Sequence, residues 1–321
     1  MKRKFEQICL YALVILIAGS FLYAQEGVDK ATVPLSKPGK PAVVEASTQN
    51  GAITVTGYNG NEVIVEATIV SKEVKDEDEK ANEKAQGLKR IQVNTTGLSI
   101  EENDNYVEIS VQAWRQTVNL DIRVPFNSSL QLHSYKGGDI TVANVKGELE
   151  IDNYSGSIKL TDISGAAVAH SYRGGVTATF KEINPDSHMS FTSMSGDIDV
   201  TFPSSTKANL KMKSDRGDVY SDFEFQIVKD PKDGFEFKEK EKPTRRGSGI
   251  STDVSVRLRD IERSVATSVR AGTGRAIVVG DNAKGVYQIA FGNFIYAKIN
   301  GGGPVFQFKN YTGDIMIRKG K

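Results

Sequence analysis

The chain has almost none of the residues that form covalent or metal-bound sites. Among 321 residues there is one cysteine, Cys9, and there are three histidines, His133, His170 and His188. A single cysteine excludes an intrachain disulfide and a cysteine-ligated metal centre, so packing and backbone pairing must stabilise the fold. No P-loop, G-x-S-x-G or H-E-x-x-H pattern occurs. The sequence therefore predicts no catalytic residue, no cofactor and no enzyme activity.

An excess of one charge is also lacking. Lysine and arginine number 41 against 40 aspartate and glutamate, which argues against a nucleic-acid partner. The apolar run Leu10–Leu22 is shorter than the about 20 residues that a membrane span needs. It follows the basic start Lys2–Lys4 and ends near Ala24, a suitable last residue before cleavage. We therefore expect a signal peptide at 1–24, export to the periplasm, outer surface or medium, and no stable membrane span after cleavage.

The rest of the chain reads as one domain. The polar, proline-containing segment 25–41 predicts a linker, and alternating apolar and polar residues from 42 onward predict strands. Two charged segments interrupt this pattern. Residues 72–90 predict one solvated helix, and residues 229–246 predict a charged loop. The expected organisation is a single domain over 42–321 with these two insertions.

Glycine recurs every nine residues from Gly138 to Gly174. Each unit continues as polar, apolar, polar, apolar and then four turn residues, so Ile140 and Val142 point to the same side of a strand. A corner that needs a positive φ or a close approach between stacked backbones favours glycine. The turn glycines of this pattern are Gly138, Gly147, Gly156, Gly165, Gly174, Gly196, Gly217 and Gly313.

The true repeat is twice as long. Tyr135, Tyr154 and Tyr172 recur about every 18 residues, which predicts two strands and two turns per coil. A chain that returns to the same place at this interval stacks its strands in parallel, about 4.8 Å apart. The predicted fold is mainly β, a parallel two-sheet β-solenoid with one charged helix near its start. Short side chains at matching turn positions are expected to bond the backbone of their own turn or the next coil. They are Ser134, Asn153, Ser171, Ser193 and Ser214.

The same register aligns three titratable residues. Each residue lies two positions before one of the recurring tyrosines: His133 before Tyr135, Asp152 before Tyr154 and His170 before Tyr172. We therefore expect one outward column with neighbours about 4.8 Å apart. The column fits a hydrogen-bonded ladder on a solvated face. It also fits a weak metal site, although it lacks the fourth ligand that structural zinc prefers.

Two chemical alternatives can be weighed against this sequence. A calcium-binding roll also has nine-residue half turns, but Ile140 and Val142 stand where its further glycine and aspartate are required. A polysaccharide-acting β-helix enzyme would use paired carboxylates. Asp197 and Asp199 point to the same side of a strand, about 6.5 to 7 Å apart, a spacing compatible with acid and base roles. A solvated strand face carries the same residues.

The motifs "SYKGGDITV", "NYSGSIKL", "SMSGDIDV" and "INGGGPVFQFKNYTGDIMIRK" resemble the bacterial putative-adhesin family of exported, toast-rack-related domains of unknown function. The resemblance covers roughly 41–318. It implies a β-solenoid outside the cytoplasm and brings no active-site residues.

The predicted function is therefore a non-catalytic envelope or surface scaffold that presents its faces to a protein or glycan partner. A module that senses envelope stress by binding a regulator is the alternative, and the oligomeric state stays open. Because solenoid ends expose unpaired backbone, the last strand, near Ile315, is expected to be capped or available for pairing.

Overall fold

The computed structural model describes residues 28–72, 96–228, 234–235, 279–280, 287–288 and 294–320. The described residues contain strands and no helix, so the predicted mainly β class is confirmed for this part of the chain. The helix predicted at 72–90 lies outside it, apart from Lys72, which ends strand β4. The signal peptide predicted at 1–24 and most of the charged loop predicted at 229–246 also lie outside it. Among the residues described, none belongs to a helix long and apolar enough to cross a membrane.

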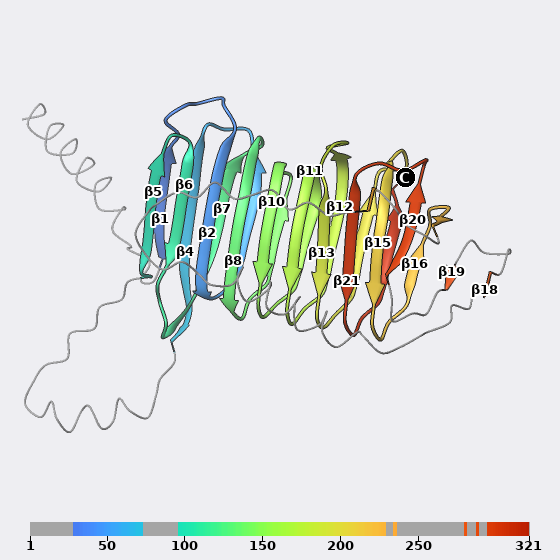
Figure 1. The fold of residues 1–321 in the computed structure, drawn as a ribbon. Coiled ribbons are helices and arrows are strands. Elements are labelled where there is room, and N and C mark those ends of the chain that lie inside the picture. The colour runs from blue at the N-terminus through green and yellow to red at the C-terminus, as the bar shows by residue number, and fades with distance from the viewer. Residues whose placement is uncertain are drawn as a thin grey trace, which may run out of the picture.

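Hydrogen-bond partners place the strands in two rows (Figure 1). Row 1 contains, in spatial order, β5 (Leu98–Asn103), β6 (Tyr106–Val111), β2 (Ala42–Asn50), β8 (Ser128–Lys136), β10 (Lys146–Asn153), the second half of β11 (Ile158–Ser171), β13 (Met189–Ser193), β21 (Val305–Asn310), β15 (Ala208–Ser214), β20 (Ile295–Ile299) and β17 (Gln226–Ile227). Row 2 contains β1 (Val28–Pro34), β4 (Glu62–Lys72), β7 (Gln116–Pro125), β3 (Ile53–Tyr58), β9 (Ile140–Ala143), the first half of β11, β12 (Val176–Ile183), β14 (Ile198–Phe202), β22 (Ile315–Lys319) and β16 (Val219–Ser221). The short strands β18 (Val279–Gly280) and β19 (Tyr287–Gln288) form a separate antiparallel pair.

The expectation of two separate sheets is corrected by strand β11. This strand runs for 14 residues without a break, so its first half belongs to row 2 and its second half to row 1. Strand β12 pairs with both halves, with a register shift near Ile163. As a result, 20 strands make one continuous hydrogen-bonded sheet. The interior pairs are parallel, whereas β1, β4, β5, β17 and β20 pair antiparallel at the two ends.

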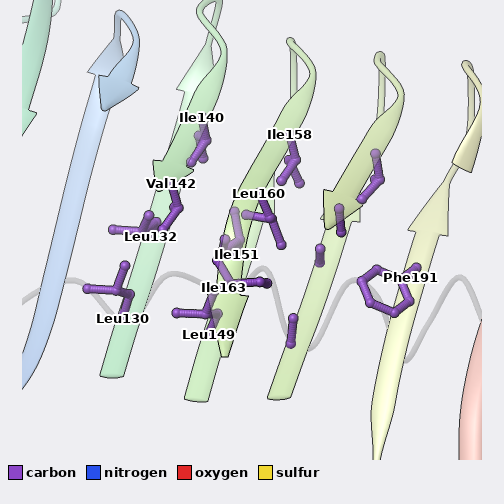
Figure 2. Close-up of a cluster of buried hydrophobic side chains, with 14 of the residues drawn as sticks. Leu130, Leu132, Ile140, Val142, Leu149, Ile151, Ile158, Leu160, Ile163 and Phe191 are labelled. Atoms are coloured by element: carbon purple, nitrogen blue, oxygen red, sulfur yellow. The ribbon is translucent and has the colours of Figure 1, made fainter. Parts of the chain in front are cut away.

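The apolar residues of the repeat lie in one buried cluster between the rows (Figure 2). Leu130 pairs with Leu149, and Ile140 pairs with Ile158, in each case the equivalent residue one repeat later along the chain. Each of these side chains is at most 3% exposed. Because alternate residues of a strand point to the same side, each returning strand adds two more apolar side chains to the same core.

Chain order and spatial order differ near both ends of the stack. We use "coil" for one strand of row 1 together with the row-2 strand that follows it along the chain. Coil β2–β3 lies between β6–β7 and β8–β9, and coil β21–β22 lies between β13–β14 and β15–β16 (Figure 1). The expectation of an end strand near Ile315 is therefore wrong, because Ile315 pairs with Ile198 on one side and Val219 on the other.

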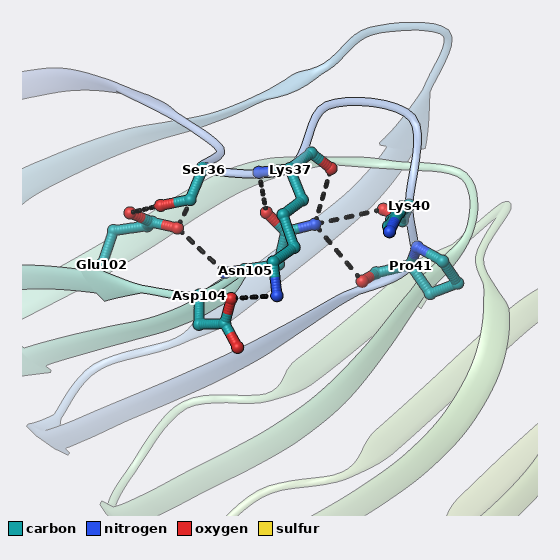
Figure 3. A network of polar contacts seen from close by, with 7 residues as sticks. All are labelled: Ser36, Lys37, Lys40, Pro41, Glu102, Asp104 and Asn105. Carbon is teal, nitrogen blue, oxygen red and sulfur yellow. Dashed lines mark hydrogen bonds and ion pairs between the residues drawn. The ribbon is translucent and has the colours of Figure 1, made fainter.

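The segment predicted as a linker at 25–41 takes part in the fold. Residues 28–34 form β1, which covers the edge of β4. After β1, a polar network holds the chain against the β5–β6 turn (Figure 3). Asn105 accepts a hydrogen bond from Lys37 N at 2.6 Å and donates one to Lys37 O at 2.8 Å. Glu102 accepts bonds from Ser36 N and Oγ at 3.1 and 2.8 Å, and these bonds hold the pKa of its carboxyl below the ordinary value.

Candidate functional site

Three tyrosines form a stacked ladder at the C-terminal ends of three neighbouring row-1 strands. Tyr135 lies at the exposed end of β8, and Tyr154 and Tyr172 directly follow β10 and β11. The Tyr135 and Tyr154 ring centroids are 5.2 Å apart, and those of Tyr154 and Tyr172 are 4.8 Å apart, with interplanar angles of 19° and 4°. The residues are 48, 41 and 38% exposed. Because neighbouring rings stack along the coil axis, the faces that they share are covered and the ring edges remain exposed.

The predicted histidine and aspartate column lies directly beside this ladder. Asp152 pairs in register with His133 on one side and His170 on the other. Each imidazole directs its Nδ1 atom at this carboxylate, with distances of 3.3 Å from His133 to Oδ2 and 3.4 Å from His170 to Oδ1. The three side chains are partly shielded, at 36, 23 and 25% exposed for His133, Asp152 and His170. The column is therefore a continuous hydrogen-bonding ladder across three coils.

Mutual stabilisation fixes the charge at the centre of this column. Burial alone would raise the pKa of Asp152, but hydrogen bonds and positive charge from His133 and His170 hold it well below its usual range. Burial likewise opposes protonation of His133. The hydrogen bond and negative charge of Asp152, with further charge from Glu45 and Glu150, outweigh burial and raise the His133 pKa. Asp152 is thus ionised at any ordinary pH.

The geometry of this column does not support the metal-site hypothesis. Both Nδ1 atoms are directed at Asp152, and across the described ranges no group of three or more histidine, cysteine, aspartate or glutamate residues is arranged to hold a metal ion. The third histidine, His188, lies elsewhere, where its Nδ1 accepts a hydrogen bond from Val305 N at 3.0 Å. It therefore contacts the first residue of β21 and takes no part in the column.

The turn glycines lie against the backbone of the neighbouring coil. A Cβ atom placed on Gly156 would lie 2.1 Å from Gly138 O, and one on Gly174 would lie 2.3 Å from Gly156 O. The remaining glycines of the pattern meet neighbouring backbone atoms within 2.2 to 2.6 Å; they are Gly138, Gly147, Gly165, Gly196, Gly217 and Gly313. No side chain fits in these gaps without separating the coils.

The short polar residues that precede these turns bond the adjacent coil. Ser171 Oγ donates to Gly156 O at 2.9 Å, and Ser193 Oγ donates to Gly174 O at 2.9 Å. The other members donate in the same way, Ser134 to Gly51 O, Asn153 to Gly138 O, Asn310 to Gly196 O and Ser214 to Gly313 O, at 2.9 to 3.1 Å. Each side chain thus bonds a backbone carbonyl at the corner of the stack, and Gly196 O accepts a second bond from Ser193 Oγ at 3.0 Å.

Sequence reasoning missed a further ladder, made by the aspartate of the Gly-Asp motif. Asp197 Oδ1 accepts the N–H of Asp314 at 2.9 Å, and Asp314 Oδ1 accepts the N–H of Asp218 at 2.9 Å. Asp139 accepts the Ser157 N–H at 2.8 Å in the same position of an earlier coil. The recurrence of aspartate directly after the turn glycine was the available signal, because each carboxylate caps the next coil.

The two carboxylates considered for sugar cleavage are engaged within the stack. Besides the bond from Asp197 to the next coil, Asp199 is held by Arg318 through two parallel contacts. Arg318 Nε lies 2.7 Å from Asp199 Oδ1, and its Nη2 lies 2.9 Å from Oδ2. Hydrogen bonding and charge from Asp199 raise the Arg318 pKa. Asp197 and Asp199 therefore bind two different residues of the same neighbouring coil.

The chain matches a family model and is similar to two solved structures. A model of the family described as Toastrack DUF4097 matches residues 23–255. This match confirms the toast-rack resemblance for the motifs within that range, whereas the motif at 299–319 lies outside it. Among solved structures, the chain is similar to a "putative cell adhesion protein" from Clostridium sporogenes ATCC 15579, with 9% identity, a TM-score of 0.36, and coverage of 91% of this chain and 99% of that one. It is also similar to a "putative adhesin" from Bacteroides fragilis NCTC 9343, with 8% identity, a TM-score of 0.24, and coverage of 91 and 96%. No curated protein matches the chain.

Proposed function

This chain belongs to the Toastrack DUF4097 family, and we propose that it acts as a non-catalytic scaffold of the cell envelope or surface. In this proposal the protein binds a protein or glycan partner along the tyrosine ladder. The observation that carries the proposal is the stack of Tyr135, Tyr154 and Tyr172. These residues are 38 to 48% exposed although their rings are held in fixed register. Clustered exposed aromatic surface is characteristic of interaction sites.

The ladder geometry restricts how a partner can bind. Neighbouring rings cover each other's faces at 4.8 and 5.2 Å, so a sugar ring stacks only at the ends of the ladder. Elsewhere a partner meets ring edges and hydroxyl groups repeated once per coil. An extended chain that runs along the coil axis, either a peptide strand or a linear glycan, can contact the three residues in succession. The ionised Asp152 and its two histidines supply polar contacts alongside.

The scaffold part of the proposal rests on the coil register. In the centre of the stack, neighbouring coils pair one repeat apart along the chain, which supports a parallel solenoid with about 18 residues per coil. Turn glycines and hydrogen-bonded side chains fix each coil to the next, so the ladder is preorganised. Preorganised groups lose little conformational entropy when they bind. The contacts of Asp197 and Asp199 with Asp314 and Arg318 of the neighbouring coil support the absence of catalysis, because both carboxylates already have partners.

A pull-down from envelope extract with the mature chain tests the proposal. The test variant is Tyr135→Ala/Tyr154→Ala/Tyr172→Ala. The matched control is Thr54→Ala/Thr141→Ala/Thr177→Ala, which changes one residue in each of three row-2 strands, β3, β9 and β12. We expect the wild type and the threonine control to retain the same protein or glycan and the tyrosine variant to lose it. Equal retention by all three proteins would contradict the role of the ladder, and turnover of a glycan would contradict the non-catalytic assignment.

A further inference from the structure

The C-terminal coil β21–β22 lies inside the stack, although it comes last along the chain (Figure 1). In row 1, Phe306 pairs in parallel with Met189 on one side and Leu210 on the other. In row 2, Ile315 pairs with Ile198 and Val219. Coils β13–β14 and β15–β16 are therefore successive along the chain but separated in space by a coil from the C-terminus.

The two separated coils carry turn groups that could form a hydrogen bond with each other directly. Ser214 Oγ now donates to Gly313 O at 3.1 Å, and Asn310 Nδ2 donates to Gly196 O at 2.9 Å. Ser193 makes the same contact with Gly174, the turn glycine of the preceding coil along the chain. The Ser214 hydroxyl thus has the chemistry and the turn position to bond Gly196 O if the inserted coil is absent.

The aspartate ladder offers the same choice of neighbour. Asp197 Oδ1 accepts the Asp314 N–H, and Asp314 Oδ1 accepts the Asp218 N–H, both at 2.9 Å. Because Asp314 and Asp218 occupy equivalent positions of their coils, Asp197 is equally suited to accept from Asp218. Both of these turn contacts that join β13–β14 to the inserted coil therefore have a counterpart in β15–β16.

The connecting chain is long enough for direct pairing. Val142, Ala178 and Val200 are equivalent positions of row 2, and Leu149, Met189 and Leu210 are the equivalent row-1 positions that follow them. Seven residues along the chain take Val142 to Leu149 in the next coil, and eleven take Ala178 to Met189 in the next coil. Ten residues take Val200 to Leu210, a number between these two values, although this connection passes over the whole coil β21–β22.

Insertion adds buried surface that direct pairing lacks. Phe306, Phe308, Ile315 and Ile317 are 0% exposed, and the Phe308 ring stacks on Phe191 with centroids 5.4 Å apart. This apolar burial favours the inserted arrangement at equilibrium. Residues 208–221 nevertheless lie much nearer to β14 along the chain than residues 305–319 do, and closing the shorter loop costs less entropy, so local pairing forms faster. Coil β15–β16 can thus pair with β13–β14 before the C-terminal coil is inserted.

We propose that β21–β22 is a strand-insertion element. In a first arrangement β15–β16 pairs directly with β13–β14, and the C-terminal coil then enters between them and lengthens the stack by one coil. The two arrangements use the same turn hydrogen bonds on β13–β14, so they compete for one edge. The fold therefore contains a two-state element that is independent of the tyrosine ladder.

Engineered disulfides distinguish the two arrangements in the full chain with Cys9→Ser. Thr192, Lys309 and Lys213 are consecutive in register across β13, β21 and β15. A disulfide needs Cα atoms about 4.4 to 6.8 Å apart, which neighbouring strands satisfy and strands two spacings apart do not. Thr192→Cys/Lys309→Cys therefore reports the inserted arrangement, and Thr192→Cys/Lys213→Cys reports direct pairing. Gln131→Cys/Val168→Cys is the matched control, since it spans β10, which is fixed in chain order.

Each double variant is refolded from denaturant and oxidised in short pulses at increasing times. We expect the disulfide of Thr192→Cys/Lys213→Cys to form early at a several-fold higher yield than the control and then decline, while that of Thr192→Cys/Lys309→Cys rises. Adding Phe308→Ala should weaken insertion and leave the direct disulfide detectable at equilibrium. If the direct disulfide never exceeds the control, either during refolding or with Phe308→Ala, the proposal is overturned.

Discussion

Replacing Gly138 with alanine tests how closely the coils are stacked. Gly138 has a φ of +109°, and a Cβ atom there would lie 2.3 Å from Gly51 C and 2.4 Å from Gly51 O. An L-residue forced into a left-handed conformation loses about 1 to 2 kcal/mol. Displacing well-packed neighbours costs about 1 to 3 kcal/mol more. We therefore expect Gly138→Ala to lower the free energy of unfolding by about 2 to 5 kcal/mol, the sum of these two costs.

Gly39 provides a control that separates the two costs. It also has a positive φ, +81°, but a Cβ atom there would meet nothing within 4 Å. Gly39→Ala should therefore cost only the conformational part, about 1 to 2 kcal/mol. Urea unfolding followed by circular dichroism gives both values under one condition. If Gly138→Ala is no more destabilising than Gly39→Ala, the coils can move apart at little cost and the packing explanation of the glycine repeat fails.

Three further substitutions have defined outcomes. The lowered pKa of Asp152 contributes stability that is lost on acidification, and the raised pKa of His133 contributes stability that is lost as pH rises. Asp152→Asn should therefore reduce the urea midpoint most between pH 3.8 and pH 6.5, the ordinary pKa values of aspartate and histidine. A flat difference across pH would refute this coupling. Phe308→Ala should lower the free energy of unfolding by about 3 to 5 kcal/mol, as for an interior residue, whereas a cost below about 1 kcal/mol would indicate that coil β21–β22 is only loosely held. Tyr154→Ala removes two stacking contacts, each worth about 0.5 to 1.5 kcal/mol, so it should lower the unfolding free energy by about 1 kcal/mol or more while Tyr154→Phe leaves it unchanged.

The centre of the stack could be predicted from the sequence because its period is local. Between Leu130 and Val176 each coil follows the previous one along the chain, so a repeat of about 18 residues translates directly into register. The alignment of His133, Asp152 and His170 and the stacking of the tyrosines both follow from that period. The turn glycines could be placed for the same reason, since parallel backbones meet at one corner in every coil.

The order of the coils at the ends could not be predicted in this way. The motif near Gly313 repeats the motif near Gly156, which shows that the C-terminal segment forms a coil but not which coils flank it. Gly313 lies between Gly196 and Gly217 in the stack. Burial of Phe306 and Phe308 among residues distant in the sequence favours this position. The antiparallel strand β1 was missed because an edge strand with one solvated face can be largely polar.

The aspartate roles show why a pattern of residues alone misassigns chemistry. Asp197 and Asp199 have the spacing of a carboxylate pair, but Asp197 caps the next coil and Asp199 binds Arg318. Both partners lie in β22 or the turn before it, more than a hundred residues away along the chain. No local pattern identifies such partners, because they depend on the insertion of the C-terminal coil.

The measurement that tests the proposed function most directly is the affinity of the retained partner for the wild type, the tyrosine variant and the threonine control. Loss of Tyr135, Tyr154 and Tyr172 removes the exposed stack and leaves the buried residues between the rows unchanged. We predict a Kd at least about tenfold higher for the tyrosine variant, equivalent to about 1.4 kcal/mol of binding free energy, and an unchanged Kd for the threonine control. Equal affinity of all three folded proteins would contradict a binding role for the ladder.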